Sequence, residues 1–83
     1  MKRVAFVTGY VKTVNPVSAY GRSLTLWLLT AITPELKIAQ VGFDNEKDRD
    51  RVIETAGISL RDTYKEVSDE VLRQLGFTPT DLD

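Results

Sequence analysis

The sequence contains no cysteine and no histidine among its 83 residues. Without cysteine, the chain can form neither a disulfide nor a thiolate metal site. Without histidine, it lacks the side chain that most often serves as general base, metal ligand or switch near neutral pH. Because serine and threonine nucleophiles are usually activated by such a base, we expect no enzymatic activity. Since the preferred thiolate and imidazole ligands are missing, we also expect no bound metal, and we expect no cofactor.

Long apolar runs are also missing. The apolar stretch at residues 24–32 (LTLWLLTAI) contains two threonines and is far shorter than the roughly 20 apolar residues of a membrane-spanning helix. The N-terminal apolar run at residues 4–7 ends at Thr8 and Gly9, so it is too short for a secretion signal. The sequence therefore predicts a soluble cytoplasmic protein, and its length predicts a single domain over residues 1–83.

Two segments resemble ligand-binding motifs but lack the residues that the chemistry needs. Residues 2–9 (KRVAFVTG) look like the first strand of a dinucleotide site, yet the G-x-G-x-x-G pattern is absent after Gly9. Residues 44–55 resemble a calcium loop, but Arg49 stands where that loop needs glycine. As a helix, this segment pairs opposite charges three residues apart, such as Glu46 with Arg49, which is typical of a solvated surface.

Charge is divided unevenly along the chain. Residues 1–43 carry five basic side chains and one acidic side chain, a net charge of +4, whereas residues 44–83 carry six basic and eleven acidic ones, a net charge of −5. The net charge of the whole chain is only −1. This division indicates that the two halves present surfaces of opposite sign, within one molecule or between copies.

The basic half has the composition of β-structure. Residues 3–14 are rich in valine, threonine and aromatic side chains, and we expect a long strand there. Leucine and threonine alternate within residues 22–32, which favours a second strand, and residues 37–43 follow as a third. Residues 16–32 also fit a helix that starts at Pro16, so a strand–helix–strand–helix–helix order remains an alternative.

The acidic half has the signals of two helices. Residues 45–56 begin with an asparagine cap and end before a glycine. Residues 60–75 carry an apolar stripe at helical spacing. The acidic tail at residues 78–83 is expected to be frayed. The predicted fold class is therefore α+β, a small antiparallel three-stranded sheet followed by two helices that cover one of its faces.

These patterns favour a small non-catalytic protein that binds another protein as a regulator, adaptor or inhibitor. An acidic helical surface can bind a basic surface on a partner, and small virus-encoded inhibitors often bind their hosts in this way. An exposed sheet edge can also pair with a strand of a partner. The predicted protein-binding residues lie on the second helix and are Asp62, Tyr64, Glu66, Asp69 and Glu70.

The basic half supports an alternative function, the binding of single-stranded nucleic acid. Aromatic rings can stack on unpaired bases while cationic side chains hold phosphates. The residues predicted for this role are Lys2, Lys12, Arg22, Tyr10, Tyr20 and Trp27. A homo-oligomer is a further expectation, because the basic sheet of one copy can face the acidic helices of another.

Overall fold

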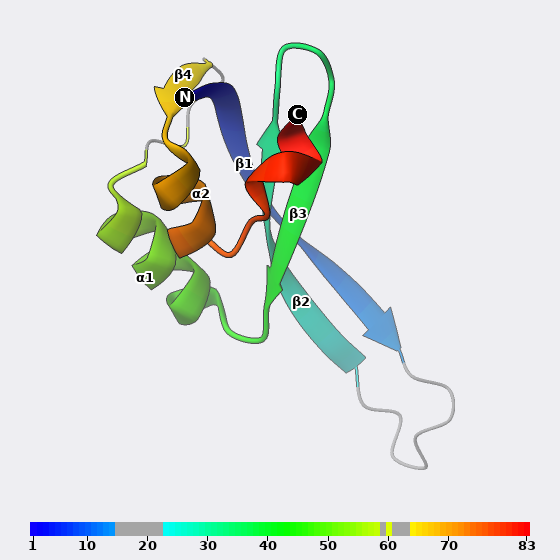
Figure 1. The fold of residues 1–83 in the computed structure, drawn as a ribbon. Helices are drawn as coiled ribbons and strands as arrows, with labels where there is room; N and C mark the ends of the chain where they lie inside the picture. The colour runs from blue at the N-terminus through cyan, green and yellow to red at the C-terminus, as the bar shows by residue number, and fades with distance from the viewer. Residues whose placement is uncertain (15–22, 59, 61–63) are drawn as a thin grey trace.

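The computed structural model describes residues 1–14, 23–58, 60 and 64–83, and Figure 1 shows how their elements are arranged. Four strands, two α-helices and one 3-10 helix are present in this part of the chain. In chain order they are β1 (Lys2–Val14), β2 (Ser23–Ile32), β3 (Ile38–Phe43), α1 (Glu46–Ala56), β4 (Lys65–Val67), α2 (Asp69–Gln74) and the 3-10 helix η1 (Pro79–Leu82).

The strands form one antiparallel sheet in the order β3-β2-β1-β4. β1 and β2 pair continuously from Ala5 opposite Ile32 to Val14 opposite Ser23, whereas β4 pairs with residues 2–4 only. The sheet is therefore wide at one end and narrows to a two-stranded hairpin, which extends past the helices in Figure 1. The predicted α+β fold with three N-terminal strands is confirmed. The helical alternative is wrong for residues 23–32, and residues 16–22 lie outside the described part.

Side chains alternate between the two faces of the sheet because successive residues of a strand point in opposite directions. We call the face that packs against α1, α2 and η1 the helix-side face, and the opposite one the open face. The helix-side face contributes one continuous core, in which the rings of Phe6 and Phe77 lie 6.2 Å apart between centroids. The buried members of this core are Val4, Phe6, Leu29, Ala31, Ile53, Val67, Leu72, Leu75, Phe77 and Leu82.

The first helix lies close to the predicted residues 45–56. The side chain of Asn45 accepts a hydrogen bond from the backbone N–H of Lys47 at 2.8 Å, which satisfies one of the free donors at the start of α1. α1 ends at Gly57, whose N–H donates to the carbonyl of Glu54 at 3.1 Å. Ile53 is buried in the core and so anchors this otherwise charged helix to the sheet.

The prediction of a second helix over residues 60–75 is wrong at residues 60 and 64–68, and residues 61–63 lie outside the described part of the chain. Lys65–Val67 form β4, and among the described residues of this range only Asp69–Gln74 are α-helical. Ser68 separates the two elements, because its side-chain oxygen accepts a hydrogen bond from the N–H of Val71 at 3.2 Å. A serine in this position is a preferred N-cap, so α2 starts there.

The apolar spacing that suggested a longer helix arises from two different surroundings. Val67 is buried because β4 lies beside β1, where it pairs with Lys2. Leu60 and Tyr64, which belong to the predicted apolar stripe, lie outside the core and are exposed. Pairing with the end of β1 satisfies the backbone groups of β4, and this tertiary contact outweighs local helix propensity.

The C-terminal tail, residues 78–83, is not frayed. It forms η1, and the side chain of Leu82 is buried in the core. The ammonium group of Lys2 lies 2.5 Å from a carboxylate oxygen of Asp83 and 3.5 Å from one of Asp69. We call Lys2, Asp69 and Asp83 the terminal clasp. It joins the two ends of the chain, so apolar burial and charge pairing together keep the tail in place.

The turn between β2 and β3 contains a backbone conformation that is unfavourable for its residue. Thr33 and Lys37 close the turn with a backbone hydrogen bond of 2.9 Å, and the N–H of Leu36 donates to the carbonyl of Thr33 at 2.9 Å. Leu36 has φ of 65° and an exposed side chain. In such three-residue hairpin loops, the left-handed position favours glycine or asparagine.

We expect Leu36→Gly to stabilise the protein by about 1 kcal/mol, because the left-handed strain that glycine removes outweighs the freedom that it adds to the unfolded chain. Urea denaturation followed by circular dichroism measures this difference. Glu35→Gly is the matched control, since Glu35 precedes Leu36 in the same turn and φ is not positive there. An equal gain in both variants would contradict the assignment of strain to Leu36.

The terminal clasp makes the stability of the fold depend on pH in the alkaline range. The hydrogen bond to Asp83 raises the pKa of the Lys2 ammonium above 10.5; loss of solvation opposes this rise and the charge of Asp69 adds to it. A pKa that is higher in the folded state means that the clasp stabilises the fold fully below pH 10.5 and less as pH rises through the folded-state value.

We therefore expect Lys2→Met to unfold at lower urea concentration than the wild type at neutral pH. The gap between them should narrow above pH 10.5, where the wild type loses the same charge. Lys37→Met, which removes an exposed lysine outside the terminal clasp, serves as the control. A gap of the same size on both sides of pH 10.5 would show that the clasp does not act through charge.

Candidate interaction surface

The open face of the sheet carries no charged side chain between residues 5 and 11 of β1, 24 and 32 of β2, or 38 and 42 of β3. Residues opposite one another on neighbouring strands share a face, which defines its members. Over these stretches they are Ala5, Val7, Gly9, Val11, Leu24, Leu26, Leu28, Thr30, Ile32, Ile38, Gln40 and Gly42, and beyond them the pair Arg3 and Glu66 lies on the same face where β4 joins the sheet. Within the stretches only Thr30 and Gln40 are polar, and the amide of Gln40 donates to the hydroxyl of Thr30 at 3.1 Å.

Several aliphatic side chains of this face are in contact with solvent. The exposed fractions are 39% for Val7, 45% for Val11, 36% for Leu26 and 58% for Ile38. Leu28 and Ile32 are half-buried between them. We call these six residues the open-face patch. A contiguous apolar patch on a small protein marks an interaction surface more often than a chance feature.

Two glycines that flank Leu28 determine the local shape of the open face. Gly9 and Gly42 are its cross-strand partners on β1 and β3. A Cβ at Gly42 would lie 2.8 Å from the Cδ2 atom of Leu26, so Leu26 packs directly over that glycine. A Cβ at Gly9 would meet no atom within 4 Å. The space above Gly9, which lies between Val7 and Val11 along this face of β1, is therefore open.

Aromatic and cationic side chains gather on the helix-side face, where the hairpin passes beyond the core. The rings of Tyr10 and Trp27 lie 5.6 Å apart between centroids, and the Lys12 ammonium is 6.0 Å from the centre of the Tyr10 ring. The Arg49 guanidinium lies 5.4 Å from the centre of the Trp27 ring. These contacts are within the range of cation–π attraction. Trp27 is thus held between a neighbouring ring and a guanidinium group.

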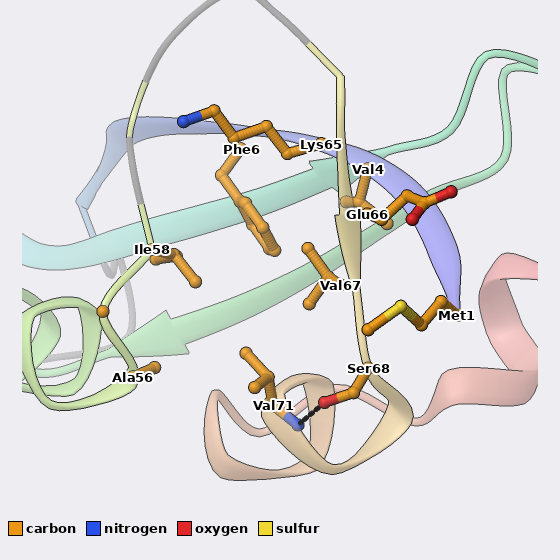
Figure 2. Close-up of a pocket in the computed structure, with 11 residues that line it drawn as sticks. Met1, Val4, Phe6, Ala56, Ile58, Lys65, Glu66, Val67, Ser68 and Val71 are labelled. Atoms are coloured by element: carbon orange, nitrogen blue, oxygen red, sulfur yellow. Dashed lines mark hydrogen bonds between the residues drawn. The ribbon is translucent and has the colours of Figure 1, made fainter.

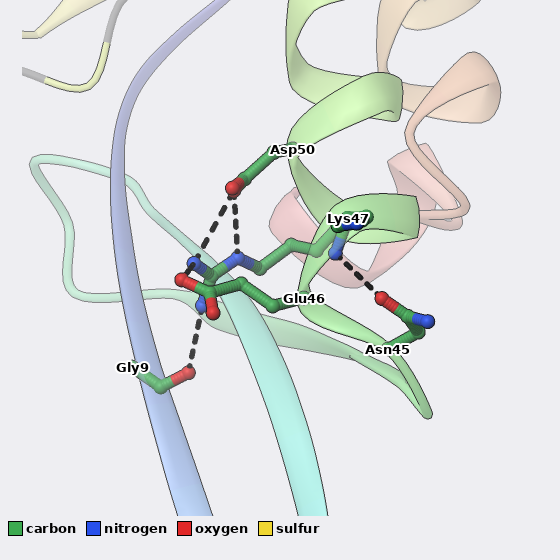
Figure 3. A network of polar contacts seen from close by, with 6 residues as sticks. Gly9, Asn45, Glu46, Lys47 and Asp50 are labelled. Atoms are coloured by element: carbon green, nitrogen blue, oxygen red, sulfur yellow. Dashed lines mark hydrogen bonds and ion pairs between the residues drawn. The ribbon is translucent and has the colours of Figure 1, made fainter.

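Arg49 is only 7% exposed, so the prediction that it lies on a solvated helix face is wrong. Its Nη1 atom donates to the carbonyl oxygen of Gly9 at 3.1 Å, and Nε and Nη2 both lie 3.3 Å from the same carboxylate oxygen of Asp50. Glu46 lies 3.6 Å from Nη2, as its i,i+3 spacing indicated. Figure 3 shows this network between α1 and β1. The guanidinium group therefore links the helix to the hairpin, and two carboxylates balance its charge.

The residues predicted for nucleic-acid binding are only partly brought together. Lys12, Tyr10 and Trp27 lie in one cluster, with Tyr10 60% exposed. Lys2 is at the other end of β1 and belongs to the terminal clasp. The two remaining residues lie outside the described part of the chain; they are Tyr20 and Arg22.

The residues predicted for protein binding do not share one helix. Tyr64 precedes β4 and Glu66 lies within it, and both side chains are exposed. Asp69 and Glu70 occupy the first turn of α2, where Asp69 also takes part in the terminal clasp. Asp62 lies outside the described residues. The role of these five residues in binding therefore stays a prediction, although the single acidic helix that motivated it is absent.

Sequence reasoning missed the open-face patch as a functional surface. The signal for it was the nearly unbroken apolar run of β2, since a strand buried on only one face normally alternates with polar residues. Leu29 and Ala31 fill the helix-side face of this strand, while Leu26 and Leu28 lie on the other. The run therefore contained a second apolar face.

A pocket of about 280 Å³ lies between the end of α1, β4 and the start of α2. Figure 2 shows the side chains of Phe6, Ile58, Val67 and Val71 pointing into it. The hydroxyl of Ser68 at its wall is engaged with the backbone of α2. The lining is mainly aliphatic and aromatic, so this pocket offers apolar contact rather than acid–base or nucleophilic chemistry.

Comparison of the chain with models of protein families, with curated proteins and with solved structures finds no match. Within the described residues, no helix has the length and apolar character that crossing a bilayer requires. In the same part of the chain, no three acidic side chains are grouped as ligands for a metal ion.

We expect Arg49→Met to lower the free energy of unfolding by about 2 kcal/mol, because it removes a charged hydrogen bond to Gly9 and the guanidinium contact with Trp27. Urea denaturation measures the loss, and Trp27 fluorescence reports the changed ring environment. Arg51→Met is the matched control, since Arg51 is exposed on the same helix and should change stability by less than about 0.5 kcal/mol. Equal effects of the two substitutions would contradict a special role for Arg49.

Proposed function

We propose that this chain is a non-catalytic protein-interaction domain and that its binding surface is the open-face patch. The observation that carries this proposal is a sheet with two apolar faces, of which the helices cover only one. Transfer of apolar area out of water is the largest favourable contribution to most protein association. The patch concentrates that area on one uncharged surface.

Strand addition at a sheet edge explains less of the surface. β4 pairs with residues 2–4 only, so β1 continues beyond it without a partner strand on that side among the described residues. An added strand would satisfy backbone groups there, but it would extend the sheet in its own plane. Val7, Val11 and Leu26 would remain in contact with water. A partner that packs on the open face removes them from water directly.

Nucleic-acid binding remains the second candidate, and the cluster of Tyr10, Trp27 and Lys12 supports it. Stacking on bases requires accessible ring faces, and affinity requires several cations near phosphates. Trp27 already packs against Tyr10 and the Arg49 guanidinium, and two carboxylates of α1 face the charge of Arg49. Lys12 is then the remaining cation of this cluster in the described part of the chain. These contacts within the cluster favour the open-face patch over the cluster as the binding surface.

Neighbouring residues of β1 provide a direct test in the cells that make the protein. Val11 lies on the open face, whereas Lys12, the next residue, lies on the helix-side face; both are exposed. A photo-reactive phenylalanine analogue is placed at one position or the other. We expect the probe at Val11 to cross-link to protein in high yield and the probe at Lys12 to give several-fold less.

Three outcomes would contradict the proposal: no cross-link at Val11, equal protein cross-linking at both positions, or cross-links from Val11 to lipid alone. Nucleic-acid cross-links from the Lys12 probe, with none to protein from the Val11 probe, would establish the second candidate instead. A cross-link between two copies counts as protein and agrees with the proposal.

A further inference from the structure

We propose that the partner on the open face is a second copy of this chain, so that two sheets pack face to face in a dimer. This inference rests on the proposed function and names the partner of the same surface. Two sheets packed in this way lie about 10 Å apart, with side chains of the inner faces interdigitating. The resulting order of layers is helices, sheet, sheet and helices.

The charges of the molecule favour a second copy as this partner. The open-face patch carries no charge, so two copies that meet on it bring no ion into the patch and leave none unpaired there; Arg3 and Glu66, which pair across β1 and β4, lie on the same face outside the patch. Residues 44–83 carry a net charge of −5, and their helices lie on the opposite side of the sheet. A face-to-face dimer therefore keeps the two acidic layers apart, separated by both sheets, and limits their mutual repulsion.

The exposed area is in the range that a modest dimer needs. The exposed fractions of the open-face patch correspond to on the order of 400 Å² of apolar surface per copy, when each fraction is multiplied by the area of a fully exposed aliphatic side chain. Apolar atoms make up about 65% of homodimer interfaces, so an interface built on this patch covers roughly 600 Å² per copy. This is near the lower end of the size range of stable, specific interfaces.

The shape of the open face also suits an apolar side chain from another sheet. The space above Gly9 is open, and Leu28 is the cross-strand neighbour of this glycine. On the other side of Leu28, the space above Gly42 is already filled by a neighbouring leucine of β2. One copy thus presents both aliphatic side chains and an open space at Gly9 that can receive one. A two-fold axis makes each copy use the same surface for both purposes.

The experiment measures the mass of the purified protein by sedimentation equilibrium over a dilution series from about 1 mM to about 1 µM, which spans weak to moderate affinities. We expect twice the monomer mass of 9.3 kDa at the high end and dissociation on dilution. The variant Val7→Lys places a charge on the open face. The matched control Thr8→Lys places it on the adjacent exposed residue, which faces the helix side.

Val7→Lys should weaken dimerisation at least 10-fold, and Thr8→Lys should leave it within about 2-fold of the wild type. Circular dichroism confirms that each variant is folded. A monomeric wild type throughout the series would overturn the dimer even if neither variant folds. A wild-type dimer that both lysine variants weaken equally would also overturn it, because the contact would then lie elsewhere.

The cellular cross-linking and the sedimentation measurement separate the two proposals. A monomer in solution whose Val11 probe captures a different protein retains the interaction function and excludes the second copy. A monomer whose Val11 probe captures nothing excludes both.

Discussion

The architecture depends on an excess of apolar sheet surface over the surface that the described helices cover. β2 is apolar on both faces and lies between β1 and β3 within the sheet. The segments that follow β3 pack on the helix-side face, where they complete one core. The open-face patch is the direct consequence.

The helix-side face is completed by two different kinds of contact. Near the termini, Leu72 and Leu82 bury apolar surface against the sheet, and the terminal clasp holds the chain ends together. Toward the hairpin, the apolar contacts from the helices end. There the guanidinium group of Arg49 covers the sheet, because it stacks on Trp27 and donates a hydrogen bond to the carbonyl of Gly9. A guanidinium group suits this boundary because its planar surface packs on a ring while its edge donates hydrogen bonds.

Local signals were sufficient where the chain pattern and the tertiary surroundings agree. Asn45 and Gly57 delimit α1 as their residue types indicate, and valine-rich β1 is a strand along its whole length. The same reasoning misplaced β4, because residues 65–67 take their conformation from pairing with the end of β1. It also misplaced Arg49, because a charge on a helix gives no sign that a tryptophan from a distant strand will cover it.

Residue type and local spacing were enough to specify the α+β class, the three N-terminal strands, the limits of α1 and the lack of cysteine and histidine chemistry. Which face of β2 is covered was settled by tertiary packing alone. Periodicity shows that both faces are apolar, but it does not show on which side the helices pack. That choice buries Leu29 and leaves Leu26 in contact with solvent, and so it defines the candidate interaction surface.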